Sequence, residues 1–281
     1  MDTDLAGKTA LITGGSTGIG RAIALALGAE GVALAVASRN PDREAIEEMR
    51  ALGVSALAIP ADLSTEKGAV HAVRTAIRAL GRIDLLVVNA ATAHHEPVTK
   101  VTTSKWDQTL RTNLTGAMWV CRKACVGMIE RGAGSVLIVG STAQYFRAPA
   151  QSAYHVSKTA LAAYASALAV ELAPHGIRVN MLVPGSFPTA LNAPLRDQDE
   201  ERLLADIPLC RQGRPAECGP PAVFLLSDRL ASYITGAELA VSGGMHLRPI
   251  VRISRRELKA LNEPDSSESL SDESQNLTEA M

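Results

Sequence analysis

Seven near-continuous apolar runs recur along the chain and predict buried strands. They are rich in Val, Ile, Leu and Ala and do not alternate between apolar and polar positions, which is typical of strands buried on both faces of a parallel sheet. The runs span residues 9–13, 32–38, 56–61, 83–90, 135–141, 178–185 and 238–244. The pattern therefore predicts a parallel sheet of about seven strands.

Stretches with helical periodicity lie between these runs, for example residues 41–53, 66–81 and 152–174. Because strand and helix alternate, right-handed crossovers place helices on both faces of the sheet. The sequence thus predicts an α/β fold with a doubly wound, Rossmann-type parallel sheet in a single domain, residues 1–246. Such a sheet binds ligands in a crevice at the carboxyl ends of the strands, where the direction of winding reverses.

Two segments depart from this alternation. Residues 186–214 show no strand pattern and include the charged stretch from Arg196 to Ile207. We expect them to form a loop with a short polar helix that covers the substrate as a lid. Residues 247–281 begin with a basic stretch and continue with an acidic, serine-rich stretch that has few large apolar residues. That composition predicts a disordered C-terminal extension.

Composition and charge narrow the class of partner. The chain has 281 residues, of which 47% are hydrophobic, and a net charge of -1. These values favour a small-molecule partner over nucleic acid or an anionic membrane surface. The absence of a secretion-type leader and of a membrane-length apolar run predicts a cytoplasmic protein. The cysteines lack the paired spacing of a zinc site, and we expect reduced, mostly buried thiols at Cys121, Cys125, Cys210 and Cys218.

A glycine-rich stretch, "TGGSTGIG" from Thr13 to Gly20, follows the first predicted strand and opens a helix. Gly14 suits a tight turn, Gly18 lets the backbone approach a phosphate, and Gly20 lets helix and strand pack together. The free N–H groups at the helix start would then meet a pyrophosphate. An ordinary tight turn is the alternative, but the position directly after the first strand favours phosphate binding.

The end of the second predicted strand indicates which dinucleotide is bound. An NAD-preferring fold tends to place Asp or Glu there, whereas this chain has Ser38 and Arg39. A guanidinium stacks on adenine and pairs with a 2′-phosphate in a bidentate way, which favours NADP over NAD. The alternative is that Arg39 is a solvated residue paired with Asp42 or Glu44. Thr17 adds no second basic residue to the glycine loop.

Tyr154 and Lys158 stand out among the apolar positions of the helix predicted over residues 152–174. Residues four apart share one face of a helix, so both side chains should point toward the crevice. A phenol can protonate the alkoxide formed when a carbonyl accepts hydride, and a nearby ammonium lowers the pKa of that phenol. The alternative is that the two side chains merely snorkel from a packed helix.

Together these motifs resemble the short-chain dehydrogenase/reductase family over roughly residues 5–245. The glycine loop has the family form Thr-Gly-x3-Gly-x-Gly. The stretch "VNAA" stands in place of the family's Asn-Asn-Ala-Gly, with Asn89 and Ala90 matching and Val88 and Ala91 differing. The resemblance implies an NAD(P)-dependent oxidoreductase that acts on a CH–OH or C=O group.

The resemblance also implies a catalytic tetrad around Tyr154 and Lys158. Ser141 is placed to hydrogen-bond the substrate oxygen, and Asn113 matches an asparagine that kinks its helix and holds a water next to the lysine. Lys158 would in addition hold the hydroxyls of the nicotinamide ribose. Because unrelated packing would not place all four residues at the family spacing, the snorkelling alternative is disfavoured.

The same resemblance assigns further cofactor contacts. Asp62 and Leu63 match a pair that contacts adenine, and "PGSFPT" matches a segment that binds the carboxamide through its backbone and a threonine, with Phe187 and Thr189 as candidates. The predicted cofactor-binding residues are Gly14, Ser16, Thr17, Gly18, Ile19, Gly20, Ser38, Arg39, Asp62, Leu63, Asn89, Ala90, Tyr154, Lys158, Pro184, Gly185, Phe187 and Thr189.

Three candidate functions remain open at the level of the sequence. A 3-oxoacyl thioester is the first substrate class, because the overall pattern resembles 3-oxoacyl-[acyl-carrier-protein] reductases. A sugar, polyol or cyclic-alcohol dehydrogenase using NAD(P) is the enzyme alternative. A dinucleotide-sensing regulator is the non-enzyme alternative, and it should lack part of the tetrad. The resemblance further implies a homotetramer, and Arg122, Lys123 and Arg131 would receive a carrier protein unless they form a solvated helix face.

His94, His95 and Glu96 form a cluster after the fourth predicted strand. Metal binding needs three or four converging ligands, and no helical His-x3-His pattern supports it, so no metal is expected. We expect the cluster to border the substrate pocket or to lie in a solvated loop.

Overall fold

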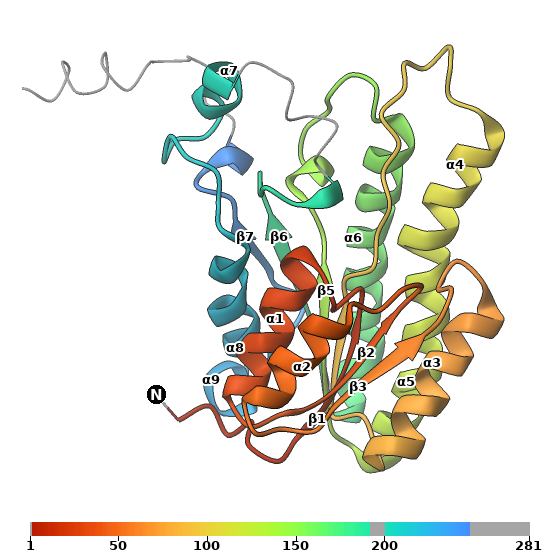
Figure 1. Cartoon of the computed structure of the whole chain (residues 1–281), viewed down its shortest axis with the longest axis vertical. Coiled ribbons are helices and arrows are strands. Elements are labelled where there is room, and N and C mark those ends of the chain that lie inside the picture. The colour runs from red at the N-terminus through yellow and green to blue at the C-terminus, as the bar shows by residue number, and fades with distance from the viewer. Residues whose placement is uncertain (1, 192–199, 248–281) are drawn as a thin grey trace, which may run out of the picture. The chain divides into compact units, whose positions relative to one another are not determined.

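The computed structural model describes residues 2–191 and 200–247 and contains a seven-stranded sheet in the order β3-β2-β1-β4-β5-β6-β7, with every neighbouring pair parallel (Figure 1). This confirms the predicted doubly wound fold and all seven predicted strands. The strands are β1 (Thr9–Thr13), β2 (Ala33–Ser38), β3 (Ala56–Pro60), β4 (Leu85–Val88), β5 (Gly134–Val139), β6 (Ile177–Pro184) and β7 (Glu238–Val241).

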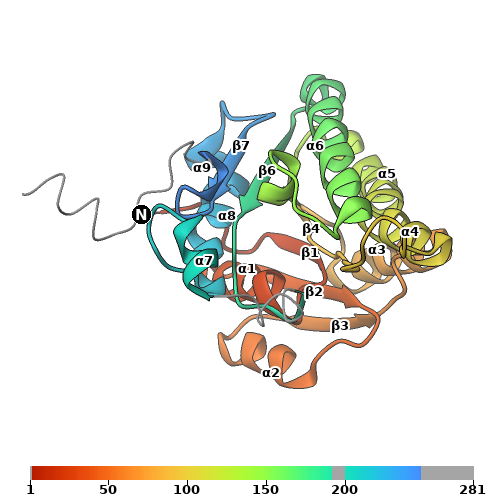
Figure 2. The same ribbon diagram turned by 90° about the horizontal axis from the view of Figure 1, so that it is seen from above.

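Helices cover both faces of this sheet, as Figure 2 shows from above. One face packs against α1, α2 and α8, and the other against α3, α5 and α6, each through its own cluster of buried side chains. The helices are α1 (Gly18–Ala29), α2 (Arg43–Ala51), α3 (Glu66–Leu80), α4 (Thr103–Leu110), α5 (Gly116–Arg131), α6 (Ser152–Leu172), α7 (Glu200–Ala205), α8 (Gly219–Leu226) and α9 (Asp228–Ala231). A π-helical turn, Arg111–Thr115, joins α4 to α5.

Helix α3 illustrates how local sequence sets these elements. The Thr65 hydroxyl accepts a hydrogen bond from the Gly68 N–H (3.1 Å) and caps the helix start, while Gly81 ends it with a φ of 82° that favours glycine. Its apolar residues recur every three or four positions, so they form one stripe that packs on the sheet. The buried members are Ala69, Ala72, Val73 and Ala76.

Two predicted segments fall partly or wholly outside the described residues. The predicted lid, residues 186–214, includes residues 192–199, which are not described, and its described part contains the expected short helix, α7. The predicted extension, residues 247–281, lies outside the described residues except for Leu247. Among the residues that are described, no helix combines the length and the apolar character needed to cross a membrane.

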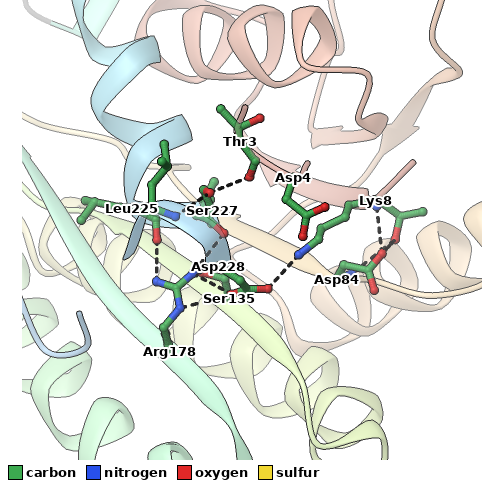
Figure 3. Close-up of polar contacts among 12 residues, drawn as sticks. Thr3, Asp4, Lys8, Asp84, Ser135, Arg178, Leu225, Ser227 and Asp228 are labelled. Carbon is green, nitrogen blue, oxygen red and sulfur yellow. Dashed lines mark hydrogen bonds and ion pairs between the residues drawn. The ribbon is translucent and has the colours of Figure 1, made fainter. Parts of the chain in front are cut away.

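A buried arginine joins α8 and α9 to the amino ends of the central strands (Figure 3). The Arg178 guanidinium, from the second residue of β6, donates hydrogen bonds to the Leu225 carbonyl (2.7 Å), the Ser135 hydroxyl (3.1 Å) and the Asp228 carboxylate (2.9 Å). The same carboxylate accepts from Lys8 (2.7 Å), just before β1. This network lies at the edge of the sheet opposite the carboxyl ends of the strands.

We expect Arg178→Ala to lower the free energy of unfolding by about 3 kcal/mol, because it leaves buried acceptors without their donor. Lys8→Ala, which removes the exposed side of the same network, should cost about 1 kcal/mol or less. Urea unfolding of both variants measures the difference. Equal losses would show that the buried guanidinium contributes no more than a surface ion pair.

Candidate active site

The predicted cofactor residues gather at the carboxyl edge of the sheet, around the point where β1 pairs with β4 and the winding reverses. Thirteen of the eighteen line an open cleft of about 370 Å³ between the glycine loop and the ends of β2, β3 and β4. The predicted residues that line it are Gly14, Ser16, Thr17, Gly18, Ile19, Gly20, Ser38, Arg39, Asp62, Leu63, Asn89, Ala90 and Thr189.

Further lining residues were not predicted from the sequence, although each lies within two positions of a predicted site residue. These are Asn40, Ala61, Ser64, Ala91, Thr112, Ala190 and Leu191. Closeness in sequence to a predicted motif was therefore the signal that could have identified these lining residues. Thr112 lies beside the predicted catalytic Asn113 in the π-helical turn, where no cofactor contact was expected.

Tyr154, Lys158, Pro184, Gly185 and Phe187 are absent from the lining of this cleft. The contact of Phe187 with the cofactor stays a prediction, and in this structure its side chain is buried. Its ring is only 2% exposed, because a large apolar ring gains free energy by packing into the core instead of facing water. The Phe187 backbone carbonyl accepts from the Thr189 N–H (2.8 Å), so this residue shapes the cleft through its main chain.

Asn89 ties the end of β4 to the glycine loop. Its amide nitrogen donates hydrogen bonds to the carbonyl oxygens of Thr13 (3.1 Å) and Gly14 (2.9 Å). A Cβ atom at Gly20 would collide with both the Gly14 carbonyl and the Asn89 amide. The absence of a side chain at Gly20 thus lets the start of α1 touch the glycine loop and the residue that follows β4, which is the close packing of helix and strand that the sequence predicts for this glycine.

The start of α1 fits a pyrophosphate. Thr17 precedes the helix without making a side-chain capping hydrogen bond, and the first turn contains no acidic residue. Gly18 has a φ of 53°, a left-handed conformation that glycine adopts without strain. The first N–H groups of the helix are therefore available to an anion, and the helix dipole favours one there.

At the other end of the cleft, Arg39 is exposed and forms no ion pair with any other described residue. The carboxylate of Asp42 instead caps α2 by accepting from the Glu44 N–H (3.0 Å). The pairing of Arg39 with Asp42 or Glu44, considered above as the alternative to phosphate binding, is not present. The Ser38 and Ser16 hydroxyls lie 3.5 Å apart beside it.

Tyr154 and Lys158 share one face of α6, as predicted, and the Lys158 ammonium lies 5.9 Å from the centre of the Tyr154 ring. The ammonium donates a hydrogen bond to the Val139 carbonyl (2.9 Å) at the end of β5. Burial raises the pKa of Tyr154, and the Ser141 side chain partly opposes this shift. The Ser141 hydroxyl thus lowers the phenol pKa in this structure, and the predicted effect of the Lys158 ammonium on that pKa stays a prediction.

Asn113 lies in the π-helical turn, which agrees with the implied break in its helix. Its amide oxygen accepts from the Thr92 N–H (2.8 Å), and its amide nitrogen donates to the Thr92 carbonyl (2.9 Å) and the Ser157 hydroxyl (3.0 Å). Both amide hydrogens are therefore used in tying the loop after β4 to α6. The water implied by the family resemblance stays a prediction, and it would have to be held by another group of this residue.

The loop after β4 contains the histidine and glutamate cluster. His94 hydrogen-bonds Gln108 (3.0 Å), and Glu96 pairs with Lys105. Both ring nitrogens of His95 are buried and have no hydrogen-bond partner among the described residues. The described part of the chain contains no group of three or more His, Cys, Asp or Glu residues able to hold a metal ion.

Basic residues on α5 and the cysteines can also be placed. Arg122 pairs with Glu66, and Arg131 donates to the Ile83 carbonyl (2.7 Å), so both are engaged within the chain. The thiols are free, and three of the four are buried as expected: Cys121, Cys125 and Cys218.

Comparison with known proteins gives a consistent family. The family model described as Enoyl-(Acyl carrier protein) reductase matches residues 14–246. L-rhamnose 1-dehydrogenase (NAD(P)(+)) from Sphingomonas sp. is 34% identical over 249 residues, which cover 86% of this chain and 98% of that protein. The 3-oxoacyl-[acyl-carrier-protein] reductase FabG from Staphylococcus aureus is 33% identical over 243 residues, covering 85% of this chain and 98% of that protein.

Solved structures agree with this result. A putative short-chain alcohol dehydrogenase from Sinorhizobium meliloti has a TM-score of 0.85 and 35% identity, covering 89% of this chain and 100% of that chain. A putative NAD(P)-dependent gluconate 5-dehydrogenase from Beutenbergia cavernae, with bound NADP, has a TM-score of 0.83 and 36% identity, covering 87% of this chain and 99% of that chain.

The buried Lys158 generates a prediction about stability. Burial lowers its pKa from the usual 10.5 to about 8, so between these values the unfolded protein binds one proton more than the folded protein. The resulting destabilisation is fully present below pH 8 and is relieved as the pH rises toward 10.5. Without cofactor, Lys158→Met should therefore raise the free energy of unfolding at pH 7 by up to about 3 kcal/mol.

Urea unfolding at pH 7 and near pH 10 tests this, with Lys67→Met on the exposed face of α3 as the control. We expect the gain from Lys158→Met to shrink at the higher pH while the control shows no such trend. A gain that is absent at pH 7, or that does not depend on pH, would contradict the assigned cost of the buried ammonium.

Proposed function

The chain belongs to the short-chain dehydrogenase/reductase family, and from this membership we propose that it transfers a hydride between NADP and a carbonyl compound or secondary alcohol. Membership in this family makes it an oxidoreductase with a nicotinamide cofactor. The observation that carries the proposal is the pair of Tyr154 and the buried Lys158 on one face of α6, with the ammonium 5.9 Å from the centre of the ring, in a chain whose glycine loop lines an open cleft.

The residues of the cleft divide the task of holding the dinucleotide. The uncapped start of α1 would bind the pyrophosphate, and Arg39 would bind the 2′-phosphate of the adenosine ribose. Asp62 and Leu63 would flank the adenine. Thr189 and the backbone from Pro184 to Phe187 would hold the carboxamide, and Lys158 the hydroxyls of the nicotinamide ribose. When bound, the nicotinamide supplies or accepts the hydride.

Proton transfer falls to Tyr154. In reduction the phenol O–H bond breaks and its proton passes to the substrate oxygen, leaving a phenolate; oxidation reverses this step. The Ser141 hydroxyl would donate to the same oxygen and stabilise its developing charge. Because burial raises the pKa of Tyr154, the phenol is protonated at neutral pH and is ready for the reductive direction. Lys158, with a pKa of about 8, is then mainly an ammonium that supports the phenolate.

Two substrate classes accompany this reaction. The first is a 3-oxoacyl thioester, supported by the resemblance to the FabG reductases; the second is a sugar or polyol, supported by the similarity to rhamnose and gluconate dehydrogenases. Identity to the rhamnose dehydrogenase and to FabG is nearly the same, 34% and 33%, so sequence similarity does not rank them. The regulator alternative is disfavoured because all four tetrad residues are present.

We further propose a cytoplasmic homotetramer. The outer surface of α5 and α6 carries exposed aliphatic side chains, including Val126 (48% exposed) and Val170 (78% exposed), which association would remove from water. Free thiols throughout the described chain favour a reducing compartment.

Residues 186–214 would cover the substrate, and the Gln212 amide already hydrogen-bonds the Ser186 hydroxyl (2.9 Å) to hold the two ends of the segment together. Carrier-protein binding at α5 would have to use Lys123, because its basic neighbours are engaged.

Removal of the Arg39 guanidinium tests the cofactor proposal. Arg39→Ala should raise KM for NADPH about tenfold or more and leave KM for NADH within about twofold, because only the 2′-phosphate loses a partner. Arg43→Ala removes the same charge on α2 outside the cleft and should change neither value. Steady-state kinetics with both cofactors decide the matter, and equal effects of Arg39→Ala on NADPH and NADH would overturn the preference for NADP.

Removal of one hydroxyl tests the proposed acid. Tyr154→Phe should cut turnover about a hundredfold or more while NADPH binding, followed by nucleotide fluorescence, stays within about twofold. Tyr164 lies further toward the carboxyl end of the same helix, next to Cys121. Tyr164→Phe is therefore the matched control and should retain turnover. Near-normal turnover in Tyr154→Phe would refute the mechanism.

A further inference from the structure

His155 follows Tyr154 on α6 and is almost completely buried, with 3% exposure. Its Nδ1 atom lies 2.8 Å from the Ala143 carbonyl oxygen, and its Nε2 atom accepts a hydrogen bond from the Ala148 N–H (2.9 Å). Both partners are backbone groups of the loop between β5 and α6. The ring thus bridges two points of one loop from the helix that carries the proposed acid.

These two contacts define the state of the ring. A backbone N–H only donates, so the Nε2 atom facing Ala148 must present a lone pair. The proton of a neutral imidazole then resides on Nδ1, where it is donated to the Ala143 carbonyl. His155 is therefore assigned as the neutral Nδ1–H tautomer, and both of its nitrogens are satisfied.

Ala143 connects this ring to the substrate-binding serine. While its carbonyl accepts from His155, its N–H donates to the Ser141 Oγ atom (3.2 Å). The Ser141 side chain in turn acts on the phenol, because it opposes the rise that burial causes in the pKa of Tyr154. A path of hydrogen bonds therefore runs from His155, the residue after Tyr154, through the Ala143 peptide to the Ser141 hydroxyl.

The loop has a second anchor on its far side. The Glu238 carboxylate of β7 accepts from the Gln144 amide (2.9 Å) and from the Tyr145 hydroxyl (2.6 Å). The Ala143 carbonyl also accepts a hydrogen bond from the exposed Arg147 guanidinium (3.0 Å). Arg147 belongs to the same loop, so this bond does not connect the loop to another element. Within the described part of the chain, the side-chain hydrogen bond that joins the Ala143 carbonyl to α6, the helix of the proposed acid, is therefore the one from His155.

We propose that His155 is a positioning residue: its neutral imidazole holds the loop after β5 so that the Ser141 hydroxyl stays aligned with Tyr154 and the substrate oxygen. This inference rests on the proposed function, because it assigns His155 a task in the same hydride transfer. The Ser141 lone pair that faces Ala143 is occupied, which leaves the hydroxyl hydrogen to be donated toward the reacting oxygen. A buried histidine that merely fills space in the core is the rival interpretation.

Three substitutions separate these interpretations, because each keeps a different part of the ring. His155→Asn retains a donor near the position of Nδ1 and therefore the bond to Ala143. His155→Gln retains an acceptor near the position of Nε2 and therefore the bond to Ala148. His155→Phe retains an aromatic ring but neither hydrogen bond. We expect kcat to fall about tenfold or more in the Phe and Gln variants, with KM for NADPH unchanged, and to stay within about threefold of the parent in the Asn variant. His175→Phe, an exposed histidine beyond the end of α6, is the control and should match the parent.

Turnover is measured with NADPH and acetoacetyl-coenzyme A, and with NADP⁺ and L-rhamnose. A kcat within threefold of the parent in all three variants overturns the proposal, and so does an equal loss in the Asn and Phe variants, which would assign the effect to packing. The protonation state is read separately, without turnover, from the ¹⁵N chemical shifts of the imidazole. An Nε2–H tautomer overturns the proposal even in an active enzyme. An Nδ1–H tautomer in a protein that binds NADPH but turns over neither substrate supports the hydrogen bond from His155 to Ala143. In that case it is the proposed function that is wrong.

Discussion

The pairing of β1 with β4 is the constraint on which the rest of the site depends. These strands are neighbours in parallel register from Ala10 opposite Leu85 to Thr13 opposite Val88, although β2 and β3 lie between them in sequence. The chain therefore winds outward in opposite directions from this pair. The loops after β1 and β4 leave the sheet side by side, and the Asn89 amide fastens one to the other. On one side of this point lie the predicted adenosine contacts, and on the other lie the loop after β5 and the proposed proton donor.

The proposed catalytic pair, Tyr154 and Lys158, is buried at a cost to stability. An ammonium buried on α6 is disfavoured by the low dielectric of its surroundings, and the single hydrogen bond to the Val139 carbonyl does not restore the pKa of Lys158 to its usual value. The same burial raises the pKa of Tyr154. Burial thus disfavours the charged form of both groups, the phenolate of Tyr154 and the ammonium of Lys158. Groups arranged in this way beside a cleft are characteristic of acid–base sites. The loop between β5 and α6 adds the geometric part, because its backbone positions Ser141 relative to the phenol.

The sheet could be predicted from the sequence because strands buried on both faces need continuous apolar runs, and these runs are visible without any partner. The ends of the strands could not. The predicted strand over residues 83–90 stops at Val88, because the Asn89 side chain turns to the glycine loop, and the strand predicted over residues 135–141 stops at Val139, before Ser141 caps the short 3₁₀ turn Thr142–Gln144. Within the site, Phe187 could not be placed from its motif, since a bulky ring in that segment packs into whichever space the core offers. His155 gave no signal at all, because its partners are backbone atoms whose position depends on the folded loop.

Hydride transfer from NADPH is the central claim, and its most direct test follows deuterium from the C4 position of the nicotinamide. Purified protein would receive deuterated NADPH, or deuterated NADH in parallel, with acetoacetyl-coenzyme A and with a panel of ketoses and aldonolactones, and the product would be analysed by mass spectrometry. The account predicts deuterium on the new carbinol carbon of at least one product, delivered at least about tenfold faster from NADPH than from NADH. Binding of NADPH without transfer of deuterium to any of these carbonyl compounds would contradict it, as would transfer from NADH at an equal rate.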